Sequence, residues 1–478
     1  MREIIYPEVA EWRNTMIRKT GFVLLCLLSM GSVSIFSQDI MVLDLEQSVS
    51  IALQNNPELK MAEKEVGKAK AGVGEAYATL LPTVDANVNF QHAWELQRNL
   101  IPNFLKPMLA PLAPVIPELE QMPDFVELVF GLENTFRYGV TLTQPLFLGG
   151  AGIAGVQMAK AGLRASEYLL ETKKQALIYR TTDAFYGCLV TKELIQVQEE
   201  ALEEAEANLD IVLKKYEVGS ASGLDKMRAE VEVANLKPSL ISARNSYRSA
   251  LTGLRTVLGL SDDVEIEIQG ALEFVPDAWG NQSLEDLLNQ AYQYRPELLA
   301  LGSQKRMAAK GVSLARSEFL PKLFFQSDYS FLGMRNDLRF QSDDFNKGFT
   351  SAVSLQIPIF HGFRSVRQYQ KASLDFKIVQ DSEKQLQDGI VAEVEISYNT
   401  FKEAEEKYQA ALESVSLAEE ALRLANLMYE EGASTQLDVL SSQLALTRAR
   451  LNRISALYEY QKARYALRRA TGTLKGIL

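Results

Sequence analysis

Residues Gly150 to Gly155 match the wording of a nucleotide-binding motif. They read Gly-Ala-Gly-Ile-Ala-Gly, and in dinucleotide-binding folds such a G-x-G-x-x-G turn holds a cofactor pyrophosphate at a helix N-terminus. The strand expected before this turn alternates in polarity and contains Pro145, whereas a buried parallel strand is uniformly apolar. A very long helix follows, without a returning strand. We interpret the segment as a strand-to-helix corner and expect no cofactor.

Other reactive side chains are few and scattered. The chain has two cysteines and two histidines, namely Cys26, Cys188, His92 and His361. Their separation argues against a disulfide scaffold, a zinc cluster or a Cys/His catalytic pair. The acidic residues at 199–204 and 262–263 read as a solvated helix face and a loop, because carboxylates that catalyse acid–base steps need contrasting environments. The sequence therefore predicts no enzyme activity and no metal site.

Two copies of a repeated motif contain an aspartate that could instead attract ions. Both halves of the chain carry the same residue types in the same order: Tyr216, Gly219, Leu224 and Asp225, then Tyr429, Gly432, Leu437 and Asp438. In a rotationally symmetric oligomer one aspartate per chain forms a ring that attracts cations. The alternative, which composition alone favours, makes both aspartates ordinary first-turn residues that are stabilised by the helix dipole.

Composition and the N-terminal segment further limit the possible fold class, partners and location of the protein. The chain has 478 residues, 47% of them hydrophobic, which is enough for a sizeable core. Its 50 basic and 61 acidic residues give a net charge of −11, which argues against nucleic acid as a partner. Residues 16–37 contain a basic start, a short apolar run and small residues, as a secretory signal does. We expect residues 1–37 to be a signal peptide, with Met16 as a candidate start.

The chain is an internal duplication. Ala52–Leu59 matches Ala291–Leu298, and Pro145–Phe147 matches Pro358–Phe360. We therefore predict a first repeat over 38–260, a linker or equatorial segment over 261–282, and a second repeat over 283–478. Each repeat is expected to contain a short helix, a second helix opened by proline, two strands and a hairpin of two long helices. The long helices are predicted at about 151–217, 224–259, 364–430 and 436–472.

The predicted strands alternate strictly between polar and apolar residues. We place them at about 83–95, 135–148, 322–332 and 348–360. Apolar and aromatic residues on one face with polar residues on the other suit a transmembrane barrel around an aqueous lumen. Four strands cannot close a barrel, since about eight is the practical minimum. Several chains must therefore share one barrel.

Large residues recur every seven positions along the long helices, as at Phe401, Tyr408 and Val415, with alanine three positions later. This heptad predicts close antiparallel coiled-coil hairpins. Cys188 lies on the matching seam of the first repeat and is interpreted as a core residue. The first repeat also holds an excess of 26 residues, a proline-rich apolar insertion around 102–124. Its exposure would suit a membrane interface, a neighbouring chain or an external partner.

In these features the sequence resembles the TolC-type outer-membrane efflux protein family. The doubled A-L-x-x-N-P-E-L-like element and the Y-x-x-G-x-x-x-x-L-D motif at both tips carry the resemblance. It implies a mainly α fold with transmembrane β structure: long antiparallel coiled-coil hairpins and four strands per chain that contribute to a shared 12-stranded trimeric barrel. The implied function is the outer-membrane tunnel of a tripartite efflux or type I secretion system, extending into the periplasm.

The resemblance also assigns roles to residues. The implied partners are two further copies, outer-membrane lipid, a periplasmic adaptor (membrane fusion) protein and an inner-membrane pump. The family's gate and selectivity positions fall on Asp225, Tyr429 and Asp438, whereas its gate arginine and second ring aspartate fall on Ser434 and Ser441. The tips expected to contact the adaptor carry Gly219, Leu224, Gly432 and Leu437. The Arg–Asp gate link of the family is therefore absent from this chain.

Three functional interpretations remain in competition on the sequence alone. The first is a passive export duct without catalysis, driven by its partners. The second is an envelope-spanning coiled-coil structural protein that conducts nothing. The third, a periplasmic hydrolase, is disfavoured because the sequence has neither a compact α/β pattern nor a nucleophile motif. The polar strand faces favour the duct over the structural protein.

Overall fold

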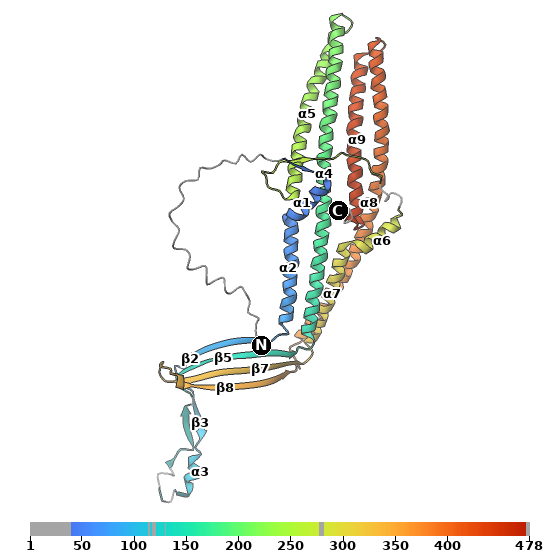
Figure 1. The fold of residues 1–478 in the computed structure, drawn as a ribbon. Helices are drawn as coiled ribbons and strands as arrows, with labels where there is room; N and C mark the ends of the chain where they lie inside the picture. Colours follow the sequence, from blue (N-terminus) through green and yellow to red (C-terminus); the bar gives the residue numbers. More distant parts are fainter. Residues whose placement is uncertain (1–39, 113–114, 117–120, 130, 277–281, 475–478) are drawn as a thin grey trace, which may run out of the picture.

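The fold is mainly helical and elongated, with a four-stranded sheet at one end and two helical hairpins at the other (Figure 1). The computed structural model describes residues 40–112, 115–116, 121–129, 131–276 and 282–474. The expected signal peptide at 1–37 lies outside the described residues. Within them, no helix is both long enough and apolar enough to cross a membrane.

The two repeats contain matching helices. In the first they are α1 (Leu45–Asn55), α2 (Pro57–Ala78), α4 (Ala151–Glu217) and α5 (Gly223–Leu258). In the second they are α6 (Leu284–Tyr294), α7 (Pro296–Ser317), α8 (Arg364–Glu430) and α9 (Gln436–Ala470). Both α4 and α8 have 67 residues, which corresponds to about 100 Å at 1.5 Å per residue. The prediction of two very long helices, each followed by a returning helix, is confirmed.

Local sequence explains where the shorter helices begin. Pro57 opens α2 at the first helical position, where the missing N–H costs nothing. Asn56 caps the same helix, since its Oδ1 accepts from the Glu58 amide at 2.9 Å. Pro296 opens α7 in the same manner, although Arg295 supplies no side-chain cap. The proline that recurs in both repeats therefore marks the start of the second helix in each.

The core follows the predicted heptad seams. Phe401 and Cys188 are fully buried, and Val415 is nearly so. Phe401 packs against Tyr460 of α9 with ring centres 5.5 Å apart, which joins the two helices of the second hairpin. Burial raises the pKa of the Cys188 thiol to about 12, and an inert core thiol is what the seam position predicts.

The main sheet is antiparallel and has the order β2-β5-β7-β8. Its strands are β2 (Thr83–His92), β5 (Asn134–Phe147), β7 (Lys322–Arg335) and β8 (Phe345–Gln356). Strand β2 pairs only with β5, and β8 only with β7, among the described residues. The sheet therefore has two free edges within one chain.

The strand expected at 348–360 is displaced. Strand β8 begins three residues earlier and ends at Gln356, whose partner is Lys322, the first residue of β7. No partner strand continues beyond that pair in the described part of the chain, and Pro358 cannot donate to a ladder. Strand β2 likewise ends at His92 instead of 95, because its partner β5 begins opposite it at Asn134.

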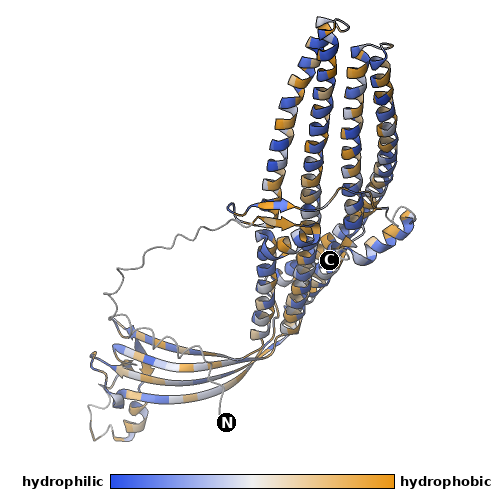
Figure 2. Ribbon diagram, turned by 45° about the horizontal axis from the view of Figure 1, so that its top comes forward, coloured by the Kyte–Doolittle hydropathy of each residue, from blue (hydrophilic) through white to orange (hydrophobic). Residues whose placement is uncertain are grey.

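The register places alternate side chains of each strand on opposite faces of the sheet, as the alternation predicts. Hydrophilic and hydrophobic residues both occur along the four strands (Figure 2). On one face Phe136, Tyr138, Phe331, Phe340 and Phe345 form an aromatic cluster near the strand ends farthest from the helices. On the opposite face Thr141 donates to Asp328 at 3.0 Å, and Arg137 donates to Ser330 at 3.3 Å. One face thus suits an apolar medium and the other suits water.

Two small sheets complete the fold. Strands β3 (Arg98–Pro102) and β4 (Phe125–Val129) form a hairpin that carries α3 (Leu105–Leu109) and η2 (Ala110–Leu112), so the insertion is flanked by regular strands. Within the linker segment, β6 (Ile266–Ile268) pairs in parallel with β1 (Met41–Leu43). Strand β6 lies in the segment expected to be an equatorial linker. Strand β1 was not predicted, because three residues are too few to show a periodic pattern.

The close approach of β5 and β7 yields a test of the sheet. A Cβ at Gly139 would lie 2.6 Å from Ser330 Cβ and 2.7 Å from the Tyr329 carbonyl, whereas at Gly348 the nearest atom is 3.9 Å away. We expect Gly139→Ala to cost about 1–3 kcal/mol through overpacking and Gly348→Ala to change stability by less than about 0.5 kcal/mol. Thermal unfolding of the β signal by circular dichroism measures both; equal midpoints would contradict the register.

Candidate gating site at the helical tips

The two hairpin tips are built by the same helix-ending motif. Gly219 and Gly432 have φ of 78° and 74°, a left-handed conformation that glycine adopts without steric cost. The amide of Ser220 donates to the Lys215 carbonyl at 2.8 Å, and the amide of Ala433 donates to Met428 at 2.7 Å. This is the Schellman arrangement, which satisfies the last carbonyls of a helix. The recurring tyrosine-to-glycine spacing is thus a helix stop.

Each returning helix begins with a reciprocal capping box. The Asp225 carboxylate accepts from the Ser222 amide at 3.2 Å and from its hydroxyl at 2.6 Å. The Asp438 carboxylate accepts from the amide and hydroxyl of Thr435 at 2.8 and 2.7 Å. The structural role that composition favoured for both aspartates is therefore present. Their carboxylates remain charged groups at the ends of the hairpins.

The two aspartates differ in their surroundings. Asp225 lies 3.7 Å from the guanidinium of Arg228, whereas no ion pair is present at Asp438 within the described part of the chain. Hydrogen bonds from the Thr435 hydroxyl and amide lower the pKa of Asp438 below its usual 3.8. Asp438 is therefore the less compensated negative charge at the tips.

A lysine that sequence analysis did not single out joins the two hairpins. Lys215, near the end of α4, places its Nζ 4.0 Å from the centre of the Tyr429 ring. The same Nζ donates to the Tyr429 carbonyl at 2.6 Å. Burial, followed by the nearby charge of Asp225, raises the pKa of the Tyr429 hydroxyl. The structure therefore brings Tyr429 and Asp225 together and adds Lys215 as their neighbour.

The only sequence signal for this contact is that Lys215 directly precedes the tyrosine of the first tip motif. Its orientation toward Tyr429 depends on how the hairpins pack, which a single sequence does not show. The positions that carry serine here form local bonds instead: Ser434 Oγ donates to Ala425 O at 3.4 Å, and Ser441 Oγ donates to Asp438 O at 2.9 Å. Neither of these bonds links the two hairpins.

Below the tips, Arg450 of α9 connects three long helices. Its guanidinium lies 3.3 Å from Glu200 and 3.1 Å from Glu204 of α4, and 3.7 Å from Glu419 of α8. The side chain of Arg450 is only 19% exposed, so this network is less screened by solvent than a surface pair. It fixes the relative height of the two hairpins beneath the Lys215 contact.

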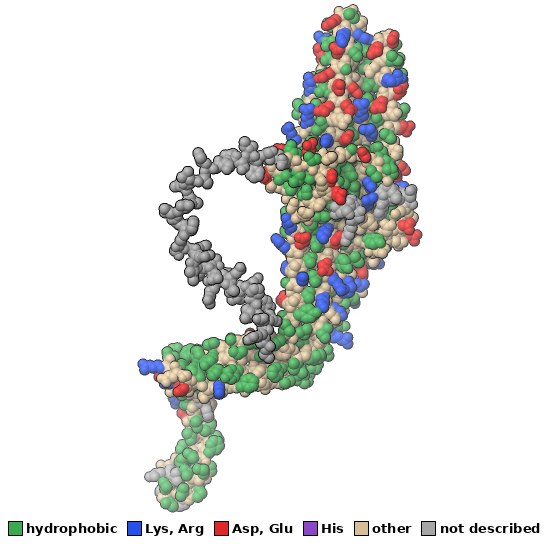
Figure 3. All heavy atoms as spheres, viewed as in Figure 1, with side chains coloured by type: hydrophobic (Ala, Val, Ile, Leu, Met, Phe, Trp, Pro, Cys, Tyr) green, Lys and Arg blue, Asp and Glu red, His purple; other side chains and the backbone are tan. Residues whose placement is uncertain are grey.

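The remaining tip residues face solvent. Leu224 is 57% exposed and Leu437 is 55% exposed, so each tip presents a leucine beside its first-turn aspartate. In the view of Figure 3 charged side chains are dense over the hairpins, while the sheet is covered mainly by hydrophobic ones. Exposed leucines in this setting are candidate contact points for another protein.

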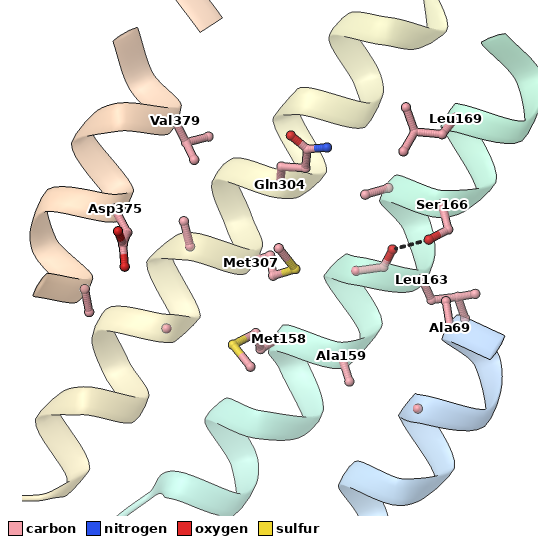
Figure 4. Close-up of a pocket in the computed structure, with 16 residues that line it drawn as sticks. Ala69, Met158, Ala159, Leu163, Ser166, Leu169, Gln304, Met307, Asp375 and Val379 are labelled. Atoms are coloured by element: carbon pink, nitrogen blue, oxygen red, sulfur yellow. Dashed lines mark hydrogen bonds between the residues drawn. The ribbon is translucent and has the colours of Figure 1, made fainter. Parts of the chain in front are cut away.

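A hollow lies away from the tips, in the layer formed by α2, α4, α7 and α8 (Figure 4). It has a volume of about 710 Å³, and its lining is mostly small or apolar, with Met158 and Met307 projecting into it. Asp375 is the one charged residue of its lining. A lone carboxylate among apolar groups has no partner for acid–base or nucleophilic chemistry.

Comparison with known proteins identifies the fold. The sequence profile of the outer membrane efflux protein family matches residues 48–260 and again residues 287–473. The chain belongs to this family. Both repeats are thus separately covered, and the predicted family is confirmed.

Individual relatives agree with this assignment. The outer membrane protein TolC of Escherichia coli K12 is 24% identical over 350 residues, which cover 71% of this chain and 70% of that protein. The cobalt-zinc-cadmium resistance protein CzcC of Cupriavidus metallidurans is 22% identical over 438 residues, with 90% of each chain covered. The Campylobacter jejuni CmeC outer membrane channel superposes with a TM-score of 0.71 at 21% identity, covering 90% of this chain and 85% of that one.

Membership settles the class of function. Proteins of the outer membrane efflux family are non-enzymatic transport proteins that work in tripartite systems. This member is an outer-membrane channel of the efflux and secretion class and extends into the periplasm. The predicted absence of catalysis therefore rests on family membership.

The cap of α9 predicts a pH response at the second tip. Because the pKa of Asp438 is lowered in the folded state, its cap stabilises the tip above the unfolded value near 3.8 and is lost as pH falls through the folded value. A spin label at Ala433 should therefore gain mobility as pH falls from neutral to well below 3.8, past the lowered pKa of the Asp438 carboxyl. In the Asp438→Ala variant the same label should be mobile over the whole pH range. Ser441→Ala, which leaves the carboxylate bonds intact, should keep the response; an unresponsive native tip would refute the capping role.

Proposed function

We propose that this channel is the passive exit duct of a tripartite efflux or type I secretion system and is gated at its periplasmic tips. The observation that carries the proposal is the sheet, which has one aromatic face, one hydrogen-bonded polar face and two free edges. A sheet of this kind requires further strands at both edges. It also requires an apolar medium on one side and water on the other.

We further propose that three copies share a 12-stranded barrel. The free edges β2 and β8 would pair between neighbouring copies, since a spanning sheet must close to satisfy its backbone. Outer-membrane lipid would cover the aromatic face, and the polar face would line the lumen. We also propose the domain plan: a signal peptide at 1–37, repeats at 38–260 and 283–478, and an equatorial segment at 261–282.

The proposed gate consists of Tyr429, Asp225 and Asp438, together with Lys215. Without the family's arginine, the Lys215–Tyr429 contact would hold the two tips of one chain together, and Asp438 would supply one acid per chain to an entrance ring. A cation over an aromatic ring contributes about 0.5–2 kcal/mol. Three such contacts would suffice to bias a channel toward its closed form.

The proposed partners are a periplasmic adaptor protein and an inner-membrane pump, which would supply the energy. Gly219 and Gly432 shape the tips, and Leu224 and Leu437 lie exposed beside them. We propose these four positions as the adaptor contact. Relatives named for metal resistance and for protease secretion indicate that ducts of this kind serve different pumps.

The alternative is an envelope-spanning coiled-coil structural protein without a conducting lumen. It would use the same helical hairpins, but it gives no reason for a polar sheet face held by Thr141, Asp328, Arg137 and Ser330. Ion conductance separates the two proposals, because only the duct forms a continuous aqueous path.

The first test is the molar mass of the protein extracted in detergent from isolated outer membranes, corrected for bound detergent. We expect a mass of three chains and single-channel conductance after reconstitution. A monomer that stays soluble without detergent would refute the barrel, because a four-stranded sheet with free edges cannot span a membrane. Three chains without conductance would favour the structural alternative.

The gate is tested with adjacent lysines. Lys215→Met removes both the ring contact and the bond to the Tyr429 carbonyl, whereas Lys214 pairs only with the exposed Asp210 of its own helix within the described chain. Losing about 0.5–2 kcal/mol in each of three chains removes about 1.5–6 kcal/mol per channel, which should raise the resting open probability at least about tenfold. Lys214→Met should leave it unchanged. Planar-bilayer recording measures both, and equal open probabilities would exclude Lys215 from the gate.

A further inference from the structure

The hairpin β3–β4 and its cap form an arm that the channel function does not explain. We define the arm as residues 98–112 and 121–129. It leaves the end of the sheet that lies farthest from the helices and extends away from them (Figure 1). The arm is therefore on the outer side of the sheet when the hairpins lie in the periplasm.

The base and the neck of the arm are well defined. Asn134 is 2% exposed, and it bonds to His92 at 2.8 Å and to the Asp337 carbonyl at 3.3 Å. At the neck, Asn103 is 7% exposed, and its Nδ2 donates to the Pro123 carbonyl at 3.0 Å. Buried, bonded asparagines at both points give the arm a fixed conformation.

The arm exposes apolar side chains on both faces and at its tip. Those more than half exposed are Leu100, Phe104, Leu105, Met108 and Phe125. Val126, Leu128 and Val129 of β4 are exposed as well. Hydrophobic side chains cover most of the described part of the arm on the face seen in Figure 3. An apolar surface that surrounds a two-stranded hairpin is not stable in water by itself.

The charged residues in the described part of the arm pair with one another. Arg98 pairs with Glu127 at 3.4 Å, and Lys106 pairs with Asp124 at 2.7 Å. These are the four charged residues of the defined arm. The described part of the arm therefore carries no net charge, which argues against electrostatic recognition by these residues; Glu118 and Glu120 of the same insertion lie outside the described residues.

Lipid tails are also a poor cover for this hairpin. Strands β3 and β4 pair only with each other among the described residues, so both outer edges carry unpaired backbone groups. Such groups cannot be satisfied in hydrocarbon. They can be satisfied by another strand, which would also cover the apolar faces.

We propose that the three arms of one channel pack against one another over its outer mouth, so that each arm is covered by its two copies. The proposal rests on the proposed trimer. The arm starts at the end of β2, an edge strand, and therefore stands at the boundary between neighbouring copies. Eleven residues from His92 to Asn103 can span about 36 Å, whereas the radius of a 12-stranded barrel is about 12 Å. The arms are therefore long enough to reach the axis.

The test uses single cysteines introduced into the full-length protein in outer membranes. Met108→Cys lies at the arm tip and Val88→Cys on the apolar face of the sheet; the native side chains are 68% and 73% exposed. Cys188 is buried and serves as the unreactive background in both. After mild oxidation with copper phenanthroline, Met108→Cys should form disulfide-linked dimers in up to about two thirds of the chains, since a ring of three leaves one unpaired. Val88→Cys should form none.

The outcomes separate this proposal from the trimer itself. Intact trimers in which Met108→Cys cross-links no more than Val88→Cys would overturn the packing of the arms but leave the barrel standing. Quenching by brominated lipid of a bimane label attached to the Met108→Cys variant would overturn it as well, because the arm would then lie in the membrane. A sample without trimers would refute the proposed function instead.

A variant with residues 98–129 replaced by a short Gly-Ser loop should conduct more than the native channel. Equal conductance would contradict a cover over the mouth.

Discussion

Backbone hydrogen bonding at the edges of a single sheet governs this molecule. Strands β2 and β8 leave a row of unpaired groups on each side of β5 and β7, and one face of the same sheet is aromatic. The described residues of one chain pair with neither outer edge of this sheet. Closure with further copies would cover them, so that in the proposed trimer the sheet, a small part of the chain, dictates the assembly of the whole.

The order of the strands in the sheet determines the lateral order of the helices that are connected to them. Helix α2 leads into β2, α4 leaves β5, α7 leads into β7 and α8 leaves β8. The neighbouring strands β2, β5, β7 and β8 therefore impose the lateral order α2, α4, α7, α8, and the packing of α4 against α2 and α7 agrees with it. A wall of helices thus continues the wall of strands, and any lumen enclosed by the sheet is extended by the helices.

Much of this could be read from the sequence because glycine and proline mark its boundaries. Helices α4 and α8 begin after Gly150 and Phe363 and end just before Gly219 and Gly432, within a residue or two of a left-handed position in every case. The ends of the strands were harder to predict from the sequence, because each strand ends where its partner strand ends. The Lys215–Tyr429 contact was missed for a related reason: it joins residues 214 positions apart, and nothing local to either residue predicts it.

The equatorial pair β1–β6 lies where the long hairpins leave the body of the molecule (Figure 1). From there α5 and α9 run 36 and 35 residues to their tips, about 50 Å of stiff helix. Each hairpin is thus a lever: a tilt of about 5° at the equator displaces its end by about 4 Å. That is as large as the separation of Lys215 from the Tyr429 ring. In the proposed duct, small rotations at mid-height would therefore be enough to open the end of the tunnel.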